Sequence, residues 1–284
     1  MKVPHFDQDT TAALVRNLVI PPRPALLDQL AALRSDPEMS LLDVAGLIAT
    51  DIGLSAAILK AANSPLFSSQ RNITSVQQAV SLLGTRNTIT LVSGLLLRLA
   101  LTAESPPAIE QFWERSMQEA AIAAALCERL GRPAEECQSF ALFRSCGIAV
   151  MLMRDARYER TLRLIGQARD RQISKIEQEF HNTSHDIVGY LVARTWNMPE
   201  PFCQAILLQH QPELFQNSSE PLLDHEHKMM VAVARTAQHV WRTSIEHNGD
   251  GAWRERADDI VGYLGMDMTE FEDWVDSMHH QLHQ

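Results

Sequence analysis

The chain has 284 residues, of which 45% are hydrophobic and 21% charged, so it is long enough to bury a core without disulfides or metal ions. Its formal net charge of -10 disfavours binding of nucleic acid by a broad basic surface, because such binding needs clustered cations that displace counterions. The four cysteines form no Cys-x-x-Cys pair, which argues against a zinc knuckle or a thioredoxin-type site and favours reduced thiols.

The sequence shows no pattern for membrane insertion. Residues 1–11 are polar and lack the apolar stretch of a signal peptide. The most apolar segment, residues 89–101, is interrupted by Arg98 and is shorter than the about 20 apolar residues that cross a bilayer. We therefore expect a buried helix there, a cytoplasmic location and no membrane partner.

Helical signals recur along the chain, whereas alternating strand patterns with tight turns do not. Prolines precede a predicted helix that ends near Arg34, and residues 109–130 predict a long helix. Four capping boxes, in which a short polar side chain and an acid or amide three residues later satisfy free backbone N–H groups, mark further helix starts. They are Ser40 with Asp43, Thr74 with Gln77, Thr183 with Asp186, and Asp267 with Glu270. The predicted fold class is all-α, a multi-helix bundle.

The Ser105-Pro106-Pro107 break is the best boundary between two helical halves. We predict an N-terminal extension or helix over residues 1–19, one domain over 20–241 and a C-terminal helical extension over 242–284. Within the domain the halves span about residues 20–104 and 107–241. The break is short, so we expect the halves to pack as one body.

The first half carries a recognisable series of motifs: a proline cluster, the segment Asp-Ile-Gly-Leu-Ser, a helix ending in Ala-Ala-Asn-Ser, and Leu-Leu-Gly. The motif residues are Pro21, Pro22, Pro24, Asp51, Asn63, Ser64 and Gly84. Their order and spacing resemble the HDOD domain, a non-catalytic relative of the HD and HD-GYP metal phosphohydrolases. We expect these residues to build the fold, with Asn63 and Gly84 each ending a helix.

The second half resembles the rest of the same domain. The matching residues are Trp113 in Phe-Trp-Glu-Arg-Ser, Gly147 in Leu-Phe-Arg-Ser-Cys-Gly, His185, Trp196, Pro199 and His210. The resemblance covers about residues 21–241. It implies an HD-like helical bundle and a role in bacterial signal transduction.

The resemblance also locates a metal site whose ligands are replaced. HD hydrolases hold one or two divalent ions that activate a water and bind phosphate oxygens. In this chain Arg115 stands in place of the first histidine, Arg144-Ser145 in place of the His-Asp pair, and the last aspartate falls near Gln238. Arginine stays protonated and has no lone pair for a metal ion. We therefore expect no metal, no cofactor and no hydrolysis.

We call five residues the relic site: Arg115, Arg144, Ser145, His185 and His210. Two interpretations of its arginines stay open. They pair with an acid such as Glu114 or Glu177, because buried charges find partners, or they bind a small anion or a nucleotide. The two histidines lack a nearby carboxylate in this interpretation, so we expect them to bond to backbone carbonyls rather than to a metal.

Other catalytic patterns are weak. No Gly-x-Ser-x-Gly segment is present. Cys146 lies near Arg144, but an inert buried thiol is the expected state. His181 and His185 have a metal-ligand spacing, yet Thr183 between them predicts a helix break.

Together these patterns indicate a non-catalytic regulatory module that binds unidentified signalling proteins. The alternatives are a metal-dependent phosphohydrolase of the HD superfamily and a nucleotide sensor that does not cleave its ligand. Metal analysis with a phosphodiesterase assay distinguishes the phosphohydrolase from the regulatory module. Calorimetry with cyclic dinucleotides distinguishes the nucleotide sensor from it.

Overall fold

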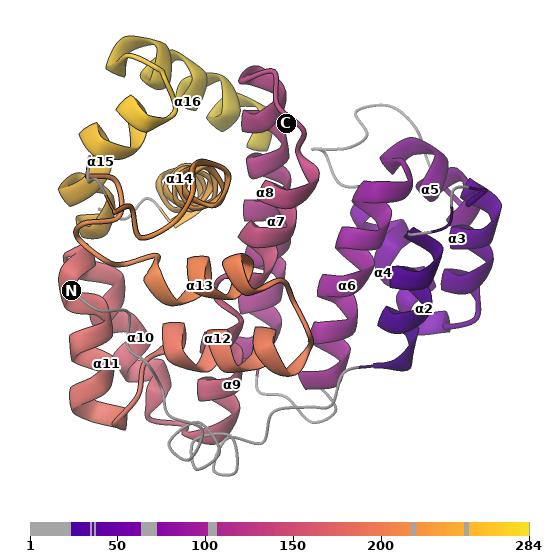
Figure 1. The fold of residues 1–284 in the computed structure, drawn as a ribbon, viewed down its shortest axis with the longest axis horizontal. Coiled ribbons are helices and arrows are strands. Elements are labelled where there is room, and N and C mark those ends of the chain that lie inside the picture. Colours follow the sequence, from indigo (N-terminus) through magenta and orange to yellow (C-terminus); the bar gives the residue numbers. More distant parts are fainter. Residues whose placement is uncertain are drawn as a thin grey trace.

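The computed structural model describes residues 24–34, 36, 38–63, 73–101, 107–216, 220–246 and 250–283, which contain helices and no strand (Figure 1). The all-α prediction is therefore confirmed. Within these residues, each helix is too short or too polar to cross a bilayer.

The first five described helices gather at one end of the molecule, at the right of Figure 1, and we call them the N-terminal lobe. They are α2 (Ala25–Arg34), α3 (Leu41–Ala49), α4 (Ile52–Ala62), α5 (Val76–Leu83) and α6 (Thr85–Leu101). α3 packs against α5, and α4 packs against α5 and α6. The predicted helix end near Arg34 is confirmed.

The later helices form the larger part of the molecule. They are α7 (Pro107–Arg129), α8 (Glu135–Phe143), α9 (Cys146–Arg154), α10 (Tyr158–Gln167), α11 (Ile173–His181), α12 (His185–Thr195), α13 (Glu200–Leu208), α14 (His225–Trp241), α15 (Gly251–Tyr263) and α16 (Met268–Leu282). α7 confirms the long helix predicted for residues 109–130. α14 appears end-on in Figure 1 and packs against α7, α8 and α13, so it forms the centre of this part.

The two parts share one hydrophobic core. Its buried side chains include Leu30 and Ile48 in the N-terminal lobe and Trp113 and Trp196 beyond it. α6 packs against α8. At this contact a Cβ on Gly94 would lie 1.9 Å from Leu142 Cδ2, so the helices approach closely only because residue 94 is glycine. The domain boundaries near residues 19 and 241 stay predictions.

Two predicted capping boxes are confirmed. The hydroxyl of Ser40 accepts a hydrogen bond from the backbone N–H of Asp43 at the start of α3, and the Asp43 carboxylate accepts one in return. Asp267 and Glu270 make the same exchange at the start of α16. Each box satisfies two backbone N–H groups that the helix leaves without a partner.

Two other predicted boxes are wrong. The box of α5 uses Ser75 and Gln78, one residue later than the predicted Thr74 and Gln77. Thr74 precedes the cap, and its backbone N–H also donates to the Gln78 side chain.

At α12 the predicted cap Thr183 lies one residue before the N-cap, Ser184, which makes no side-chain cap bond. Asp186 does not reach back to the helix start, because its carboxylate accepts hydrogen bonds from Ser174 and Gln209 in the interior.

The motif residues of the first half perform structural roles where they are described. The Asn63 side chain follows α4 and bonds to the backbone of Leu59 and Ile73. Gly84 ends α5 with a φ of 76°, a conformation that favours glycine. Asp51 accepts a hydrogen bond from the backbone N–H of Leu54 at the start of α4.

Other motif residues also take structural positions. Pro24 directly precedes α2, and Pro199 is the N-cap of α13. Trp113 and Trp196 are buried in the core. Pro21, Pro22 and Ser64 lie outside the described residues.

Candidate functional site

The relic site forms where the start of α9 meets the start of α12. Gly147, in the first turn of α9, lies against the backbone of His185. A Cβ on residue 147 would lie 2.0 Å from the His185 carbonyl oxygen and 2.7 Å from the backbone nitrogen of Gly189. Only glycine permits this approach, which brings the segment Arg144-Ser145 next to the first turn of α12.

The imidazole of His185 is buried between two carboxylates. Its Nδ1 lies 2.8 Å from Glu177 Oε2, and its Nε2 lies 3.2 Å from Asp186 Oδ1. Burial opposes a charge on this ring, but the carboxylates of Asp186 and Glu177 outweigh burial and raise the pKa of His185 to about 9. The ring is therefore an imidazolium at neutral pH.

The imidazole of His210 is held by a third buried carboxylate. Its Nδ1 lies 2.6 Å from Asp170 Oδ1. Arg235 Nη1, from α14, donates to the same oxygen at 2.6 Å, and Arg256 Nε lies 3.4 Å from Asp170 Oδ2. Burial would raise the pKa of Asp170, but Arg235 and His210 hold it below its ordinary value. Asp170 is thus ionised and lies between the guanidinium groups of Arg235 and Arg256.

Asp186 joins the two histidine groups. Its Oδ1 accepts a hydrogen bond from Gln209 Nε2 at 3.0 Å and lies 3.7 Å from His210 Nε2. Its Oδ2 accepts a hydrogen bond from Ser174 Oγ at 2.6 Å. The Nε2 atoms of both histidines therefore face a carboxylate oxygen of the protein itself.

Arg144 lies at the end of α8 with only 1% of its surface exposed. Its Nη1 donates to Gln209 Oε1 at 2.8 Å, and its Nη2 lies 3.6 Å from Glu119 Oε2. Burial lowers the pKa of Arg144 to about 10, partly offset by Glu119, so the guanidinium remains charged at neutral pH. A cation is therefore fixed beside His185 and Asp186.

Arg115 shares the same acid as Arg144. Its Nε donates to Glu119 Oε1 at 2.6 Å, one helical turn along α7. Its guanidinium carbon lies 4.7 Å from the centre of the Trp241 ring, a cation–π contact. Ser145, Arg115 and Gln238 line a cavity of about 240 Å³ beside this contact. The structure thus brings all five residues of the relic site into one region.

The partners predicted for these side chains are wrong in part. Neither arginine pairs with Glu114, which bonds to Lys60 on the surface, or with Glu177, which bonds to His185. Both use Glu119 because it projects from the same face of α7 as Arg115 and is buried beside Arg144.

The histidines of the relic site bond to carboxylates rather than to the expected backbone carbonyls. Asp170 lies on the 3-10 turn Asp170–Gln172, Glu177 on α11 and Asp186 on α12.

Several residues of this network were missed by sequence reasoning, namely Glu119, Asp170, Asp186, Gln209 and Arg235. Glu119 had a usable signal, since it follows Arg115 by four residues on a helix. Asp186 had a weaker one as the neighbour of His185. Asp170 and Arg235 are 65 residues apart in sequence, and no local pattern joins them.

Two other candidates are inert. Burial raises the pKa of Cys146 to about 12, so its thiol is neutral and unreactive, as expected. His181 ends α11 and His185 begins α12, so the predicted helix break between them is confirmed.

The metal centre that an HD-like site implies does not fit these residues. His185, Asp186 and His210 each offer an atom within 4.8 Å of the others, close enough to surround one ion. However, both ring nitrogens of His185 already face carboxylates of the protein, and the Arg144 guanidinium adds a fixed positive charge to the same network. No metal-assisted step follows from this donor set.

Comparison with known proteins identifies the family. The family model of the HDOD domain matches residues 20–212. The chain belongs to the HDOD family. The match ends before α14, although this helix forms the centre of the larger part of the HDOD protein.

Relatives share the fold at low sequence identity. An HDOD domain protein of unknown function from Geobacter sulfurreducens is 24% identical, with a TM-score of 0.70 over 97% of each chain. A candidate phosphohydrolase from Shewanella amazonensis is 20% identical, with a TM-score of 0.67 over 95% of each chain. At these identities the likeness shows the fold alone.

A curated relative is an uncharacterised protein from Treponema pallidum. It is 22% identical over 206 residues, which are 72% of this chain and 40% of the relative. This HDOD protein therefore spans less than half of that relative's length.

Proposed function

We propose that this HDOD protein is a non-catalytic regulatory module that acts by binding other proteins. The observation that carries the proposal is the buried guanidinium of Arg144, which bonds to Gln209 and faces Glu119 inside the relic site. A metal-dependent centre of the HD type holds a divalent cation among such residues, whereas here a side chain supplies the positive charge.

The charges of the site support this proposal. The buried carboxylates of Glu119, Asp170, Glu177 and Asp186 face the guanidinium groups of Arg115, Arg144 and Arg235 and the imidazolium of His185. Each carboxylate thus has a cationic partner from the protein. A divalent ion gains little from anions that are already neutralised, so this network favours a structural role.

The test uses the full chain purified without chelators. Metal content is measured by mass spectrometry, and hydrolysis of bis(p-nitrophenyl) phosphate is measured with added Mn²⁺. We expect less than stoichiometric metal and no hydrolysis above that of His185→Ala. The exposed His280→Ala variant controls for loss of an adventitious surface ligand. Stoichiometric iron, manganese or zinc, with hydrolysis lost in His185→Ala and kept in His280→Ala, would falsify the proposal.

A nucleotide sensor gains less support. The cavity beside Ser145 and Arg115 measures about 240 Å³, below the roughly 300–1,000 Å³ of ordinary ligand sites. Arg115 is also already bonded to Glu119. Calorimetry with cyclic dinucleotides tests this alternative, and saturable heat that is lost in Arg115→Ala would favour it.

A further inference from the structure

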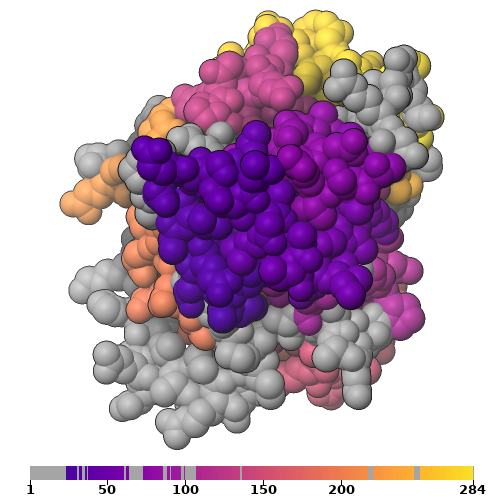
Figure 2. All heavy atoms as spheres, turned by 90° about the vertical axis from the view of Figure 1, so that its right-hand side faces the viewer, coloured from indigo at the N-terminus to yellow at the C-terminus, as the bar shows by residue number. Residues whose placement is uncertain are grey.

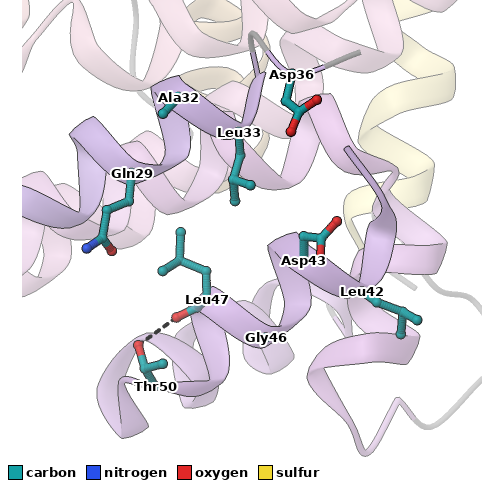
Figure 3. Close-up of a pocket in the computed structure, with 9 residues that line it drawn as sticks. All are labelled: Gln29, Ala32, Leu33, Asp36, Leu42, Asp43, Gly46, Leu47 and Thr50. Atoms are coloured by element: carbon teal, nitrogen blue, oxygen red, sulfur yellow. Dashed lines mark hydrogen bonds between the residues drawn. The ribbon is translucent and has the colours of Figure 1, made fainter. Parts of the chain in front are cut away.

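A groove lies between α2 and α3 of the N-terminal lobe (Figure 3). It is open to solvent, with a volume of about 730 Å³. Figure 2 looks onto the face where the N-terminal lobe lies, with residues of α2 to α4 in its middle. The relic site lies among the later helices, so this groove is a separate feature.

The middle of the groove is apolar. Leu33 of α2 and Leu47 of α3 point toward each other across it (Figure 3). Leu42 also lines the groove, and 59% of its surface is exposed. Covering this side chain with a partner would stabilise the complex, because it removes apolar surface from water. Leucines on both walls therefore offer anchor positions for apolar side chains.

Gly46 widens the groove in the middle of α3. It is exposed, and no atom of the described residues lies within 4 Å of the position that its Cβ would take. Gly94 and Gly147, by contrast, lie against other helices of the same chain. Glycine destabilises a helix interior relative to alanine, and nothing within the described chain requires it at position 46. Close approach of another molecule would give a reason for it.

The groove is acidic at one end. Asp36 and Asp43 lie there together, whereas Gln29 and Thr50 lie at the other end (Figure 3). Neither aspartate pairs with a cationic side chain among the residues that the structure describes. Hydrogen bonds from Ser40 hold the pKa of Asp43 below its ordinary value, so this carboxylate stays ionised. Lysine or arginine of a partner would complement this end.

We propose that this groove binds an amphipathic helix of a partner protein, with leucine-like side chains on one face and basic residues at one end. On the α3 side the lining runs from Leu42 to Thr50, so at 1.5 Å per residue the groove is about 12 Å long and holds about eight residues of a helix. Apolar anchors in a groove with charges at its rim are typical of helix-in-groove recognition. The inference rests on the proposed role in protein binding and does not involve the relic site.

The test is fluorescence anisotropy of the full chain with two labelled synthetic peptides of 14 residues. Both carry leucines at helical spacing on one face; one has four lysines at one end, and the other has four glutamates there. Gly46→Gln fills the groove with a side chain that favours helix, and Gly262→Gln makes the same change on α15, at another exposed glycine with open space around it. Circular dichroism checks that both variants melt no lower than the wild type.

We expect the lysine peptide to bind the wild type and Gly262→Gln equally, and Gly46→Gln at least tenfold more weakly. The glutamate peptide should bind the wild type at least tenfold more weakly than the lysine peptide. Absence of saturable binding, equal binding to Gly46→Gln, or equal binding of the two peptides would each overturn the proposal.

A second copy of the chain is the competing occupant. Sedimentation velocity that shows self-association of the wild type, lost in Gly46→Gln, would replace the partner helix with a dimer. These results are independent of the metal and hydrolysis measurements, so failure of the groove proposal and failure of the proposed function can be told apart.

Discussion

The side chain of Gln209 accepts a hydrogen bond from the buried guanidinium of Arg144, with 2.8 Å between Oε1 and Nη1. The amide nitrogen of the same side chain donates to Asp186 Oδ1 at 3.0 Å. An amide is both acceptor and donor, so Gln209 joins a cation to an anion without changing the charge of the site. The relic site is therefore a continuous polar network, and its parts should respond together to substitution.

Removal of Arg144 should destabilise the fold strongly. Arg144→Ala leaves Gln209 Oε1 without its donor and Glu119 with Arg115 but without Arg144, and loss of one member of a buried charge pair costs roughly 3–5 kcal/mol. Urea unfolding of the full chain measures this loss. Arg163→Ala is the matched control, because Arg163 pairs with Glu159 on the surface, where a pair contributes about 0–1 kcal/mol. Equal, small effects of the two substitutions would contradict a structural role of Arg144.

Stability should fall between pH 6.5 and 9 because of His185. The pKa of His185 is raised to about 9 in the folded state, against about 6.5 in an unfolded chain. Its contribution is therefore fully present below pH 6.5 and is lost as the pH rises through 9, with a total of about 3 kcal/mol. Unfolding free energies at pH 6.5 and pH 9 measure the loss. His185→Gln should remove most of this difference, and an unchanged difference in that variant would assign the pH dependence elsewhere.

A methyl group at position 147 should disrupt the site. In Gly147→Ala the new Cβ would meet the His185 carbonyl oxygen at 2.0 Å, so α9 and α12 must separate. We expect a loss of about 3 kcal/mol, within the range known for overpacked cores. Gly166→Ala is the control, because its Cβ would lie 3.7 Å from Arg242 Nη2, an ordinary contact. That substitution should stabilise α10 by about 0.5–1 kcal/mol, so losses of the same size in both variants would argue against the close approach at Gly147.

Manganese should not stabilise the wild type. Thermal unfolding with 1 mM Mn²⁺ should leave its Tm unchanged, because the buried Arg144 guanidinium is a fixed cation in the network that contains Gln209 and Asp186. The double substitution Arg144→His and Ser145→Asp removes that cation and supplies ligands, so its Tm should rise with Mn²⁺. A ligand at 100 times its Kd stabilises the folded state by about 2.7 kcal/mol. A rise in the wild type equal to that of the variant would show that the present residues hold the ion.

Local patterns predicted the helices well and their starts less well. Ser40 with Asp43 identified the start of α3 because the cap and its partner lie within one turn. At α5, Thr74 and Ser75 are adjacent cap residues with adjacent glutamines after them, and the sequence alone does not choose between the two registers. The structure places Ser75 at the N-cap, with Ala79, Val80 and Leu83 buried in the packed lobe.

The sequence predicted which residues make up the relic site, but not which side chains they contact. The resemblance to the HDOD domain placed Arg144 and His185 together, and the structure brings them into one network. The carboxylates that hold Arg144, His185 and His210 come from α7, α11, α12 and the 3-10 turn Asp170–Gln172. Asp170 meets Arg235 only because α14 packs through the centre of the bundle, and such long-range pairing leaves no spacing in the sequence.

The close packing at Gly94 also limits how α6 can move relative to α8. The side chain of Leu142 in α8 packs against Gly94 of α6, and Leu142 lies only two residues before Arg144. Dense packing transmits displacement rather than absorbing it. A partner that tilts the N-terminal lobe would push α6 against Leu142 and strain the segment that carries Arg144. Displacement of the N-terminal lobe is thus expected to reach the segment that carries Arg144 through Leu142.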